Sequence, residues 1–242
     1  MKYKKSSSHI LKKIDDKIKF INDNKHLYDV RTLCKCLGIF HSVYYYHCNH
    51  QTNSYKIDNA KNYPNLLEQD FYANILSQKW VGDITYIYTK ETGWTYLAIV
   101  MDLFDLKVVG WSYGLSMTES LVIETFNKAL INRGLNKDGI FHSDRGSQYT
   151  SNNFEQLLTN LNLKHSYNKK GYPYDNASME SFNAILKKEE VNVNNYKTFN
   201  EAKLAIFEFI ESWYNNQRIH SSIGYITPNQ KYNNYIANLA IA

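Results

Sequence analysis

Apolar and polar residues follow one another between residues 80 and 113 in a pattern that predicts three consecutive β-strands. Each run is rich in β-branched and aromatic residues, which suit the half-buried surface of a sheet. The predicted strands are Trp80–Thr89, Trp94–Met101 and Lys107–Tyr113, with a turn at Glu91–Gly93 between the first two. Because short connections join these strands, we expect an antiparallel meander.

After residue 113 the apolar spacing switches between helical and extended periods. Asp175 or Asn176 can cap a helix in which Met179, Phe182 and Leu186 share one face. Other helices are predicted at Thr118–Leu130, residues 151–161 and about Phe199–Asn216, and short strands at Gly139–Ser143 and Lys164–Ser166. A meander followed by alternating helices and strands implies a mixed α/β sheet with helices on both faces.

The N-terminal part of the chain has helical periodicity of its own. Ser8 can cap a helix with an apolar stripe formed by Ile10, Leu11, Ile14, Ile18 and Ile21. Val30–Tyr46 is spaced like a helix-turn-helix with Gly38 at the turn, which makes Ser42–His47 the expected recognition helix. We therefore expect a small all-α region at 1–50, a polar linker at 51–72 and an α/β domain at 73–235.

The charge distribution changes this picture only at the N-terminus. The net charge is +5, and residues 1–25 contain eight lysines and three aspartates, so everything after residue 25 sums to zero. A basic arm ahead of a neutral domain favours contact with a polyanion, most often nucleic acid, although a solvated tail has the same composition. The small all-α region is therefore predicted to bind DNA.

Four observations argue against other classes of protein. The three cysteines are an odd number for a disulfide framework. The spacing of Cys34, Cys36 and Cys48 and of the nearby histidines does not match paired zinc ligands. Apolar runs such as Tyr96–Met101 are far too short to span a bilayer, and Met1–Ser8 lacks the apolar core of a secretory signal. We expect a cytoplasmic protein without a membrane partner.

Three carboxylates stand out as candidates for chemistry. Asp83 lies inside an otherwise apolar strand, Asp144 ends another strand, and Glu180 lies in the first turn of a helix. Each acid alone could be a cap, a turn residue or half of a salt bridge, as we expect for Asp102 and Asp105. If the first three converge, their mutual repulsion calls for bound divalent cations, and all-oxygen ligation suits magnesium or manganese.

At these residues the sequence resembles the catalytic core of bacterial insertion-sequence transposases. The resemblance is to the second-reading-frame (OrfB-type) product of the group related to retroviral integrases. It extends from about Asn65 to Tyr232 and includes the DD(35)E spacing between Asp144 and Glu180. The motifs are Trp80-x-x-Asp83-Ile84-Thr85-Tyr86, His142-Ser143-Asp144-Arg145-Gly146-Ser147-Gln148-Tyr149, Gly171-x-Pro173-x-Asp175-Asn176-Ala177-x-x-Glu180-Ser181-Phe182, Tyr214-Asn215-x-Gln217-Arg218-x-His220 and Thr227-Pro228.

The resemblance implies a ribonuclease H-like fold and an enzyme that cuts DNA and joins its 3′ ends to a target. It implies that Asp83, Asp144 and Glu180 are catalytic and hold two Mg²⁺ (or Mn²⁺) ions. The DNA-binding residues it implies are Lys187, Arg145, Lys169 and Lys170. Lys187 lies seven residues after Glu180 and so projects from nearly the same helix face, although a solvated lysine would have the same spacing. The implied partners are element ends and target DNA, and a homo-oligomer on DNA; a partner from a first reading frame is left open.

One region departs from the family pattern. Relatives usually carry a further helical DNA-binding segment of several dozen residues before the signature that here reads Pro64-Asn65-Leu66-Leu67, whereas only a short polar stretch separates Tyr46 from it. This shortening leaves open a degenerate remnant that binds DNA without productive transposition. A nuclease on the same fold is disfavoured by the transposase-like tail after residue 199.

Overall fold

The structure is a computed structural model of the whole chain, and it forms two units. One unit spans Met1–Asn62 and the other Tyr63–Ala242. The residues that it describes are 14–25, 28–39, 43–44, 63–134, 136, 138–169 and 173–241. Among the described residues no helix is long and apolar enough to cross a membrane.

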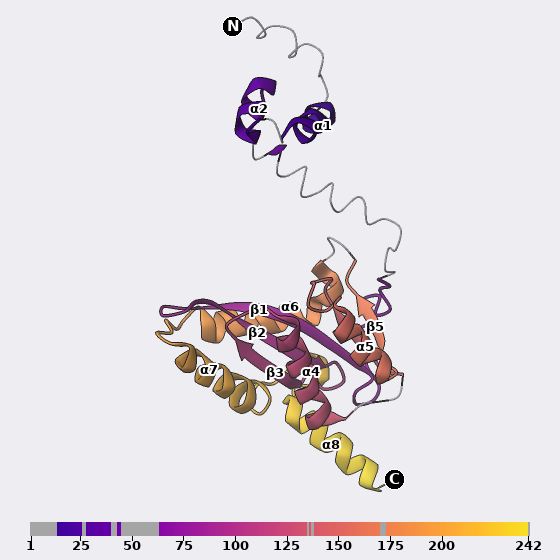
Figure 1. Cartoon of the computed structure of the whole chain (residues 1–242). Helices are drawn as coiled ribbons and strands as arrows, with labels where there is room; N and C mark the ends of the chain where they lie inside the picture. Colours follow the sequence, from indigo (N-terminus) through magenta and orange to yellow (C-terminus); the bar gives the residue numbers. More distant parts are fainter. Residues whose placement is uncertain are drawn as a thin grey trace, which may run out of the picture. The chain divides into compact units, whose positions relative to one another are not determined.

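The larger unit is built on a five-stranded mixed sheet in the order β3-β2-β1-β4-β5 (Figure 1). The strands are β1 (Lys79–Thr89), β2 (Gly93–Asp102), β3 (Val108–Gly114), β4 (Ile140–Ser143) and β5 (Lys164–Tyr167). The first three pair antiparallel, so the expected meander is confirmed. β4 then pairs parallel with β1, and β5 pairs parallel with β4.

Helices cover both faces of this sheet, as expected. One face packs against α4 (Glu119–Arg133) and α5 (Asn152–Asn160) through a core that includes Trp80, Val100, Phe126, Phe141 and Phe154. The other packs against α6 (Ala177–Leu186) and α7 (Phe199–Phe207) through a core that includes Val81, Leu97, Ile99, Phe182 and Ile206. At Gly110 a Cβ atom would lie 2.4 Å from the carbonyl oxygen of Thr125, so α4 reaches β3 only because this residue has no side chain.

The end of the chain differs from the expected single helix over Phe199–Asn216. Helix α7 ends at Phe207 and continues as a π-helical segment, Glu208–Tyr214. A further helix, α8 (Pro228–Ile241), was not predicted because its sequence is asparagine-rich and weakly amphipathic. Its start does carry a local signal: the Gln230 amide N–H donates to Thr227 Oγ1 (3.1 Å) and the Thr227 N–H donates to Gln230 Oε1 (2.9 Å). This reciprocal pair is a capping box.

Residues 63–72 belong to the folded domain, whereas the sequence assigned them to the linker. The amide N–H groups of Leu66 and Leu67 both donate to Ser166 Oγ (2.8 and 3.0 Å). The Tyr167 N–H donates to the Pro64 carbonyl, and Leu67 is buried. These partners lie about a hundred positions away in sequence, which is why local composition did not reveal them. Residues 51–62 lie outside the described residues.

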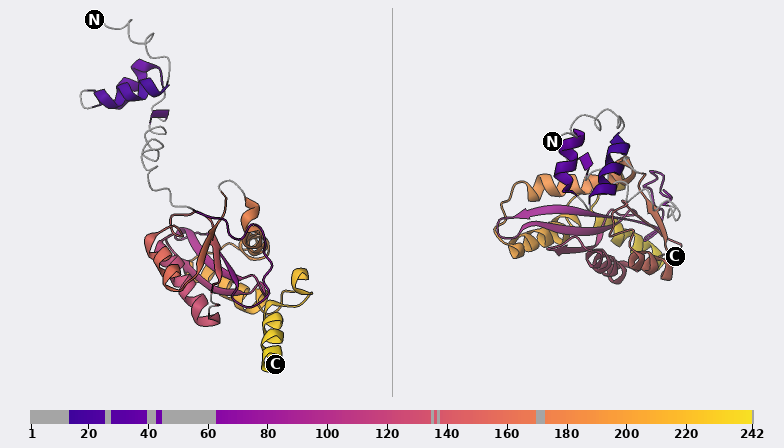
Figure 2. Two further views of the ribbon diagram at one scale, coloured as in Figure 1. Left: turned by 90° about the vertical axis from the view of Figure 1, so that its right-hand side faces the viewer. Right: turned by 45° about the horizontal axis from the view of Figure 1, so that its top comes forward.

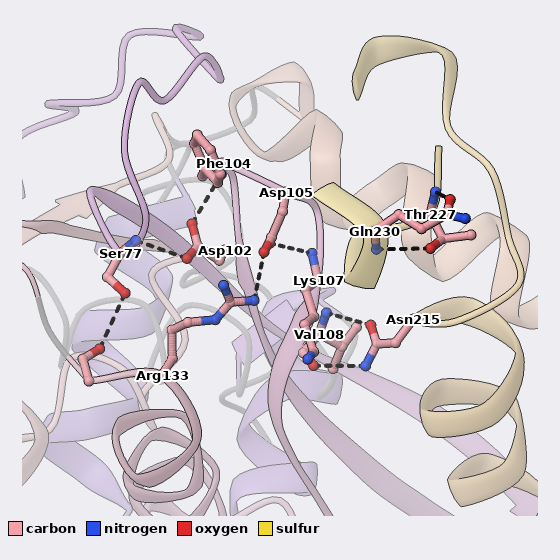
Figure 3. Close-up of polar contacts among 11 residues, drawn as sticks. Ser77, Asp102, Phe104, Asp105, Lys107, Val108, Arg133, Asn215, Thr227 and Gln230 are labelled. Carbon is pink, nitrogen blue, oxygen red and sulfur yellow. Dashed lines mark hydrogen bonds and ion pairs between the residues drawn. The ribbon is translucent and has the colours of Figure 1, made fainter. Parts of the chain in front are cut away.

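A buried polar network joins the β2–β3 turn to the end of α4 and to the C-terminal part of the domain (Figure 3). Asp102 accepts hydrogen bonds from the N–H groups of Ser77 and Phe104, and Asp105 pairs with the Arg133 guanidinium at 2.7 Å. The Asn215 side chain donates to the Val108 carbonyl and accepts from the Val108 N–H. The two aspartates are thus structural, as expected.

In the smaller unit, α1 (Ile14–Asn24) and α2 (Val30–Leu37) lie side by side (Figure 2). Their shared core includes Ile18, Ile21, Leu33, Leu37 and, beyond α2, Tyr44. Gly38 ends α2 with a φ of +64°, the left-handed conformation that suits a glycine turn. The predicted cap Ser8 lies outside the described residues. Of the expected recognition helix Ser42–His47, only Val43 and Tyr44 are described, and both are helical.

Candidate active site

Asp83 and Asp144 come from neighbouring parallel strands. β1 pairs with β4 so that Val81 lies opposite His142. Asp83 and Asp144 each follow two residues later, and residues two apart along a strand point to the same face. The two carboxylates therefore lie side by side where β4 ends and β1 continues. The convergence that the sequence suggested for these two acids is present.

The surroundings of Asp83 oppose its negative charge. The side chain is half-buried, and the pKa of Asp83 is raised to about 6, first by burial and then by the charge of Asp144. The amide of Asn183 donates to Asp83 Oδ2 at 2.7 Å, and Lys187 lowers the same pKa through its charge. These two neighbours offset only part of the cost of ionising a buried carboxyl group.

A buried aromatic residue, Tyr149, lies close to both carboxylates. Tyr149 is fully buried, and burial together with the charges of Asp83 and Asp144 raises its pKa well above its ordinary value. Its hydroxyl therefore stays neutral and close to both acids. At Gly82 a Cβ atom would lie 2.6 Å from Phe141 and 3.4 Å from the Tyr149 hydroxyl, so a glycine is needed next to Asp83.

Asp144 opens an exposed loop that the chain holds in place locally. Its Oδ1 accepts a hydrogen bond from the Gly146 N–H at 2.9 Å. The N–H groups of Tyr149 and Thr150 donate to the Gly146 carbonyl, and the Gln148 amide donates to the carbonyl of Met117. A Cβ atom at Gly146 would come within 3.0 Å of the Asp144 carboxylate, so glycine keeps this group accessible.

Glu180 lies in the first turn of α6, as predicted, and its side chain is exposed. The structure does not bring it together with the other two acids. Among the described residues no group of three or more His, Cys, Asp or Glu side chains lies close enough to hold a metal ion. The residue of α6 that contacts Asp83 is Asn183, one turn after Glu180.

The predicted cap of α6 is also different. Asn176 occupies the N-cap position without a side-chain hydrogen bond to the helix. The buried carboxylate of Asp175 instead accepts hydrogen bonds from the side chains of Asn65 and Gln69 and from the Lys169 N–H. Its role is to fasten the segment before β1 to the turn that leads into α6.

The four predicted DNA-binding cations have different surroundings. Lys187 is exposed and close enough to Asp83 to act on its pKa. Arg145 is engaged by the protein itself, because its guanidinium donates to the carbonyls of Asn168 and Tyr63. Lys169 is exposed, and Lys170 lies outside the described residues.

The donor set fits a hard divalent cation. Carboxylate oxygens are the ligands that magnesium and manganese prefer. A cation beside Asp83 and Asp144 would also remove the repulsion that raises the pKa of Asp83.

Two residues of this site were missed from the sequence: Asn183 and the neutral Tyr149. Asn183 was detectable, since it lies three residues after Glu180 and four before Lys187 on one helix face.

Two integrase core domain families match the sequence, one at residues 74–173 and one at residues 161–228. The chain is 43% identical over 172 residues to the transposase for insertion sequence element IS904 of Lactococcus lactis subsp. lactis (strain IL1403), covering 70% of this chain and 68% of that protein. It is also 43% identical over 173 residues to transposase InsF for insertion sequence IS3A of Escherichia coli (strain K12), covering 72% of this chain and 60% of that protein.

Two solved structures have a similar backbone. A chain of the simian T-cell lymphotropic virus intasome, solved with PP2A regulatory subunit B56 gamma, matches with a TM-score of 0.55 at 19% identity, covering 89% of this chain and 74% of that one. The catalytic core domain of BIV integrase matches with a TM-score of 0.50 at 18% identity, covering 68% and 99%. At such identities the likeness concerns the fold, and it confirms the expected ribonuclease H-like sheet.

Proposed function

Because the chain belongs to the insertion-sequence transposases with an integrase core domain, a family of DDE polynucleotidyl transferases, we propose that it cleaves DNA strands and transfers them by a DD(35)E mechanism. The observation that supports this proposal best is the position of Asp83, inside β1, beside Asp144, just after the parallel strand β4, with a raised pKa on Asp83. Two carboxylates that repel each other on an accessible face suit a metal-assisted phosphoryl transfer.

In this proposal Asp83, Asp144 and Glu180 hold two Mg²⁺ or Mn²⁺ ions. When bound, such ions activate an attacking oxygen and stabilise the leaving oxygen of an in-line displacement. Asp83 and Asp144 form the preorganised half of the site. Glu180 is exposed on the same helix as Asn183 and would complete the ligand set beside the other two acids.

The other residues of the site position the reactants. The Asn183 amide orients the Asp83 carboxylate through its hydrogen bond at 2.7 Å. Tyr149, kept neutral by burial, excludes water from beneath the two acids. Lys187 is exposed beside Asp83 and contacts a DNA phosphate near the scissile one, as Lys169 and Lys170 do further along the strand. Arg145 organises the loop that carries Asp144.

The substrates follow from this chemistry. Water attacks first and releases a 3′-hydroxyl at the end of the element, and this hydroxyl then attacks a target strand. The two steps join two DNA molecules, so we propose a homo-oligomer on DNA, acting in the cytoplasm, with a first-reading-frame protein as a candidate partner. A remnant that only binds DNA is the second candidate, favoured by the position of Glu180 away from the other acids.

Cleavage of duplex DNA by purified protein, with and without Mg²⁺, separates the two candidates. Asp83→Asn, Asp144→Asn and Glu180→Gln should each abolish Mg²⁺-dependent cleavage while leaving the fold intact. Asp138→Asn is the matched control, because this aspartate is exposed in the turn before β4. Near-normal cleavage by any one of the three variants would remove that residue from the site. A wild-type protein that binds DNA without cleaving it would support the remnant.

A further inference from the structure

A groove of about 780 Å³ lies beside the β1–β2 hairpin, and aromatic rings dominate its lining. Tyr86, Tyr88, Trp94 and Tyr96 contribute from the hairpin, and Lys187 contributes from the segment that follows α6. Tyr86, Tyr88 and Trp94 expose 46%, 54% and 61% of their surface. Three large rings that stay exposed beside a concave surface have not been used to build the core.

The ring geometry leaves faces open. Tyr88 contacts Trp94 edge-to-face with centroids 5.4 Å apart, and Tyr86 contacts Tyr96 in the same manner at 5.4 Å. A third edge-to-face contact joins Tyr86 and Trp94 at 6.5 Å. In an edge-to-face pair, the ring that presents its edge does not use its own faces in that contact. A planar group can therefore stack in the groove without displacing any of these contacts.

The groove walls are held in place by the backbone. The Lys90 N–H donates to the Tyr196 carbonyl and the Glu91 N–H donates to the Lys197 carbonyl, both at 3.0 Å. These bonds fasten the tip of the hairpin to the segment after α6. Because the two walls are joined in this way, the rings are arranged before any ligand arrives, which lowers the entropic cost of binding.

The charges in the groove favour an anion. Among the described residues that line it, the charged ones are Lys90 and Lys187, and none is an acid. Amide side chains at Asn192 and Asn195 supply hydrogen-bond donors and acceptors, whereas the Asn194 amide donates to Glu190. Planar rings, two cations and amides together match the three parts of a nucleotide that a protein can contact: base face, phosphate and base edge.

Two sets of contacts link the groove to the candidate active site. Lys187 lines the groove and also acts on the pKa of Asp83. On the other side, the Tyr86 hydroxyl reaches Met117 Sδ at 3.7 Å, and the Met117 carbonyl accepts from Gln148 in the loop that Asp144 opens. Tyr86 lies three residues after Asp83 on β1 and so projects from the opposite face of the strand; Lys187 and the loop that Asp144 opens connect the two aspartates to the groove.

We propose that this groove binds unpaired bases of the DNA strand that is cut, stacking them on Tyr88 and Trp94. The proposal rests on the proposed function, since DNA is the substrate. Bases within a duplex are stacked on one another and offer no free face, whereas an unpaired base offers both. The groove thus favours DNA that is frayed or single-stranded beside the cleavage point.

The test compares the affinity of the full-length protein for oligothymidine of about 15 nucleotides and for a duplex of the same length. Binding is measured by fluorescence anisotropy at fixed salt without divalent metal, so no cleavage occurs. Trp94→Ala and Tyr88→Ala should each weaken oligothymidine binding by about 5- to 150-fold, the effect of losing one stacked base. Duplex affinity should change less than twofold. Trp94→Phe should restore binding, and Tyr72→Ala, an equally accessible aromatic on another segment, should have no effect.

Equal losses for oligothymidine and duplex, or no loss for either, would overturn the proposal. A variant that alters the oligomeric state while keeping its oligothymidine affinity would assign the groove to a second copy of the chain, which also overturns it. Mg²⁺-dependent cleavage is measured separately on the wild-type protein. The absence of cleavage would refute the proposed function. Equal effects of the variants on oligothymidine and duplex affinity would refute only the proposal for the groove.

Discussion

Replacing Asp83 by asparagine removes a charge that the folded domain disfavours, so the variant should be more stable than the wild-type protein at neutral pH. In the folded protein the pKa of Asp83 is raised from 3.8 to about 6. Between these two pH values the folded state holds more protons than the unfolded state. Wild-type stability therefore falls as pH rises through this window, and the whole cost is present at pH 7.

The magnitude follows from the same two values. A difference of about two pH units at about 1.4 kcal/mol each sets an upper value of about 3 kcal/mol. Asp83 is half-buried rather than fully buried, so solvent screening lowers the expected gain to about 2 kcal/mol. For a domain of this size that corresponds to a rise of about 4–8 °C in Tm. Asparagine still accepts the hydrogen bond from Asn183, so no buried partner is orphaned.

Tryptophan fluorescence suits this measurement. All four tryptophans, at positions 80, 94, 111 and 213, belong to the larger unit, so the signal reports that unit alone. Urea unfolding of both proteins from pH 4 to pH 8 should show a stability difference that is near zero at pH 4 and largest above pH 6. Asp102, whose pKa is also about 6, titrates in both proteins and cancels in the difference.

A difference that does not change with pH, or a less stable Asp83→Asn variant at pH 7, would refute this reasoning. Added Mg²⁺ supplies an independent check. It should stabilise the wild-type protein by mass action and should stabilise the variant much less, because a ligand has been neutralised. Equal stabilisation of both would show that Asp83 does not hold the metal.

Three further predictions follow from named contacts. Arg133→Met should cost about 3–5 kcal/mol in urea unfolding, because it leaves the buried Asp105 carboxylate without its partner; a cost below 1 kcal/mol would contradict this. Lys187→Ala should lower the salt dependence of DNA binding by about one phosphate contact without changing Mg²⁺ binding. An unchanged dependence of affinity on salt concentration would show that Lys187 is a solvated lysine without a phosphate contact. Removing residues 1–25 should sharply weaken binding to duplex DNA while sparing cleavage. The intact protein should show little preference for any DNA sequence. A preference of about a thousandfold or more for element ends over random duplex would disprove the idea of a shortened recognition region.

Local pattern was enough for most elements of the larger unit. The strands Trp80–Thr89 and Trp94–Met101 and the helix after Thr118 were predicted within a few residues, because alternation and helical spacing are properties of adjacent positions. Asp83, Asp144 and Glu180 were likewise selected from motif and spacing. Where the prediction failed, as in the linker assignment of residues 63–72, the stabilising partner Ser166 lies on a distant strand.

What the sequence by itself determined is therefore the order and type of the elements, the family, and the identity of three candidate acids. Only the tertiary structure decided which groups meet. The β1–β4 register sets Asp83 beside Asp144, and the docking of α6 on the sheet brings Asn183 to Asp83, rather than Glu180 one turn earlier on the same face. Strand register and the docking of a helix on a sheet depend on contacts between residues far apart in sequence, because each is chosen by the burial of whole faces. No local window contains that information.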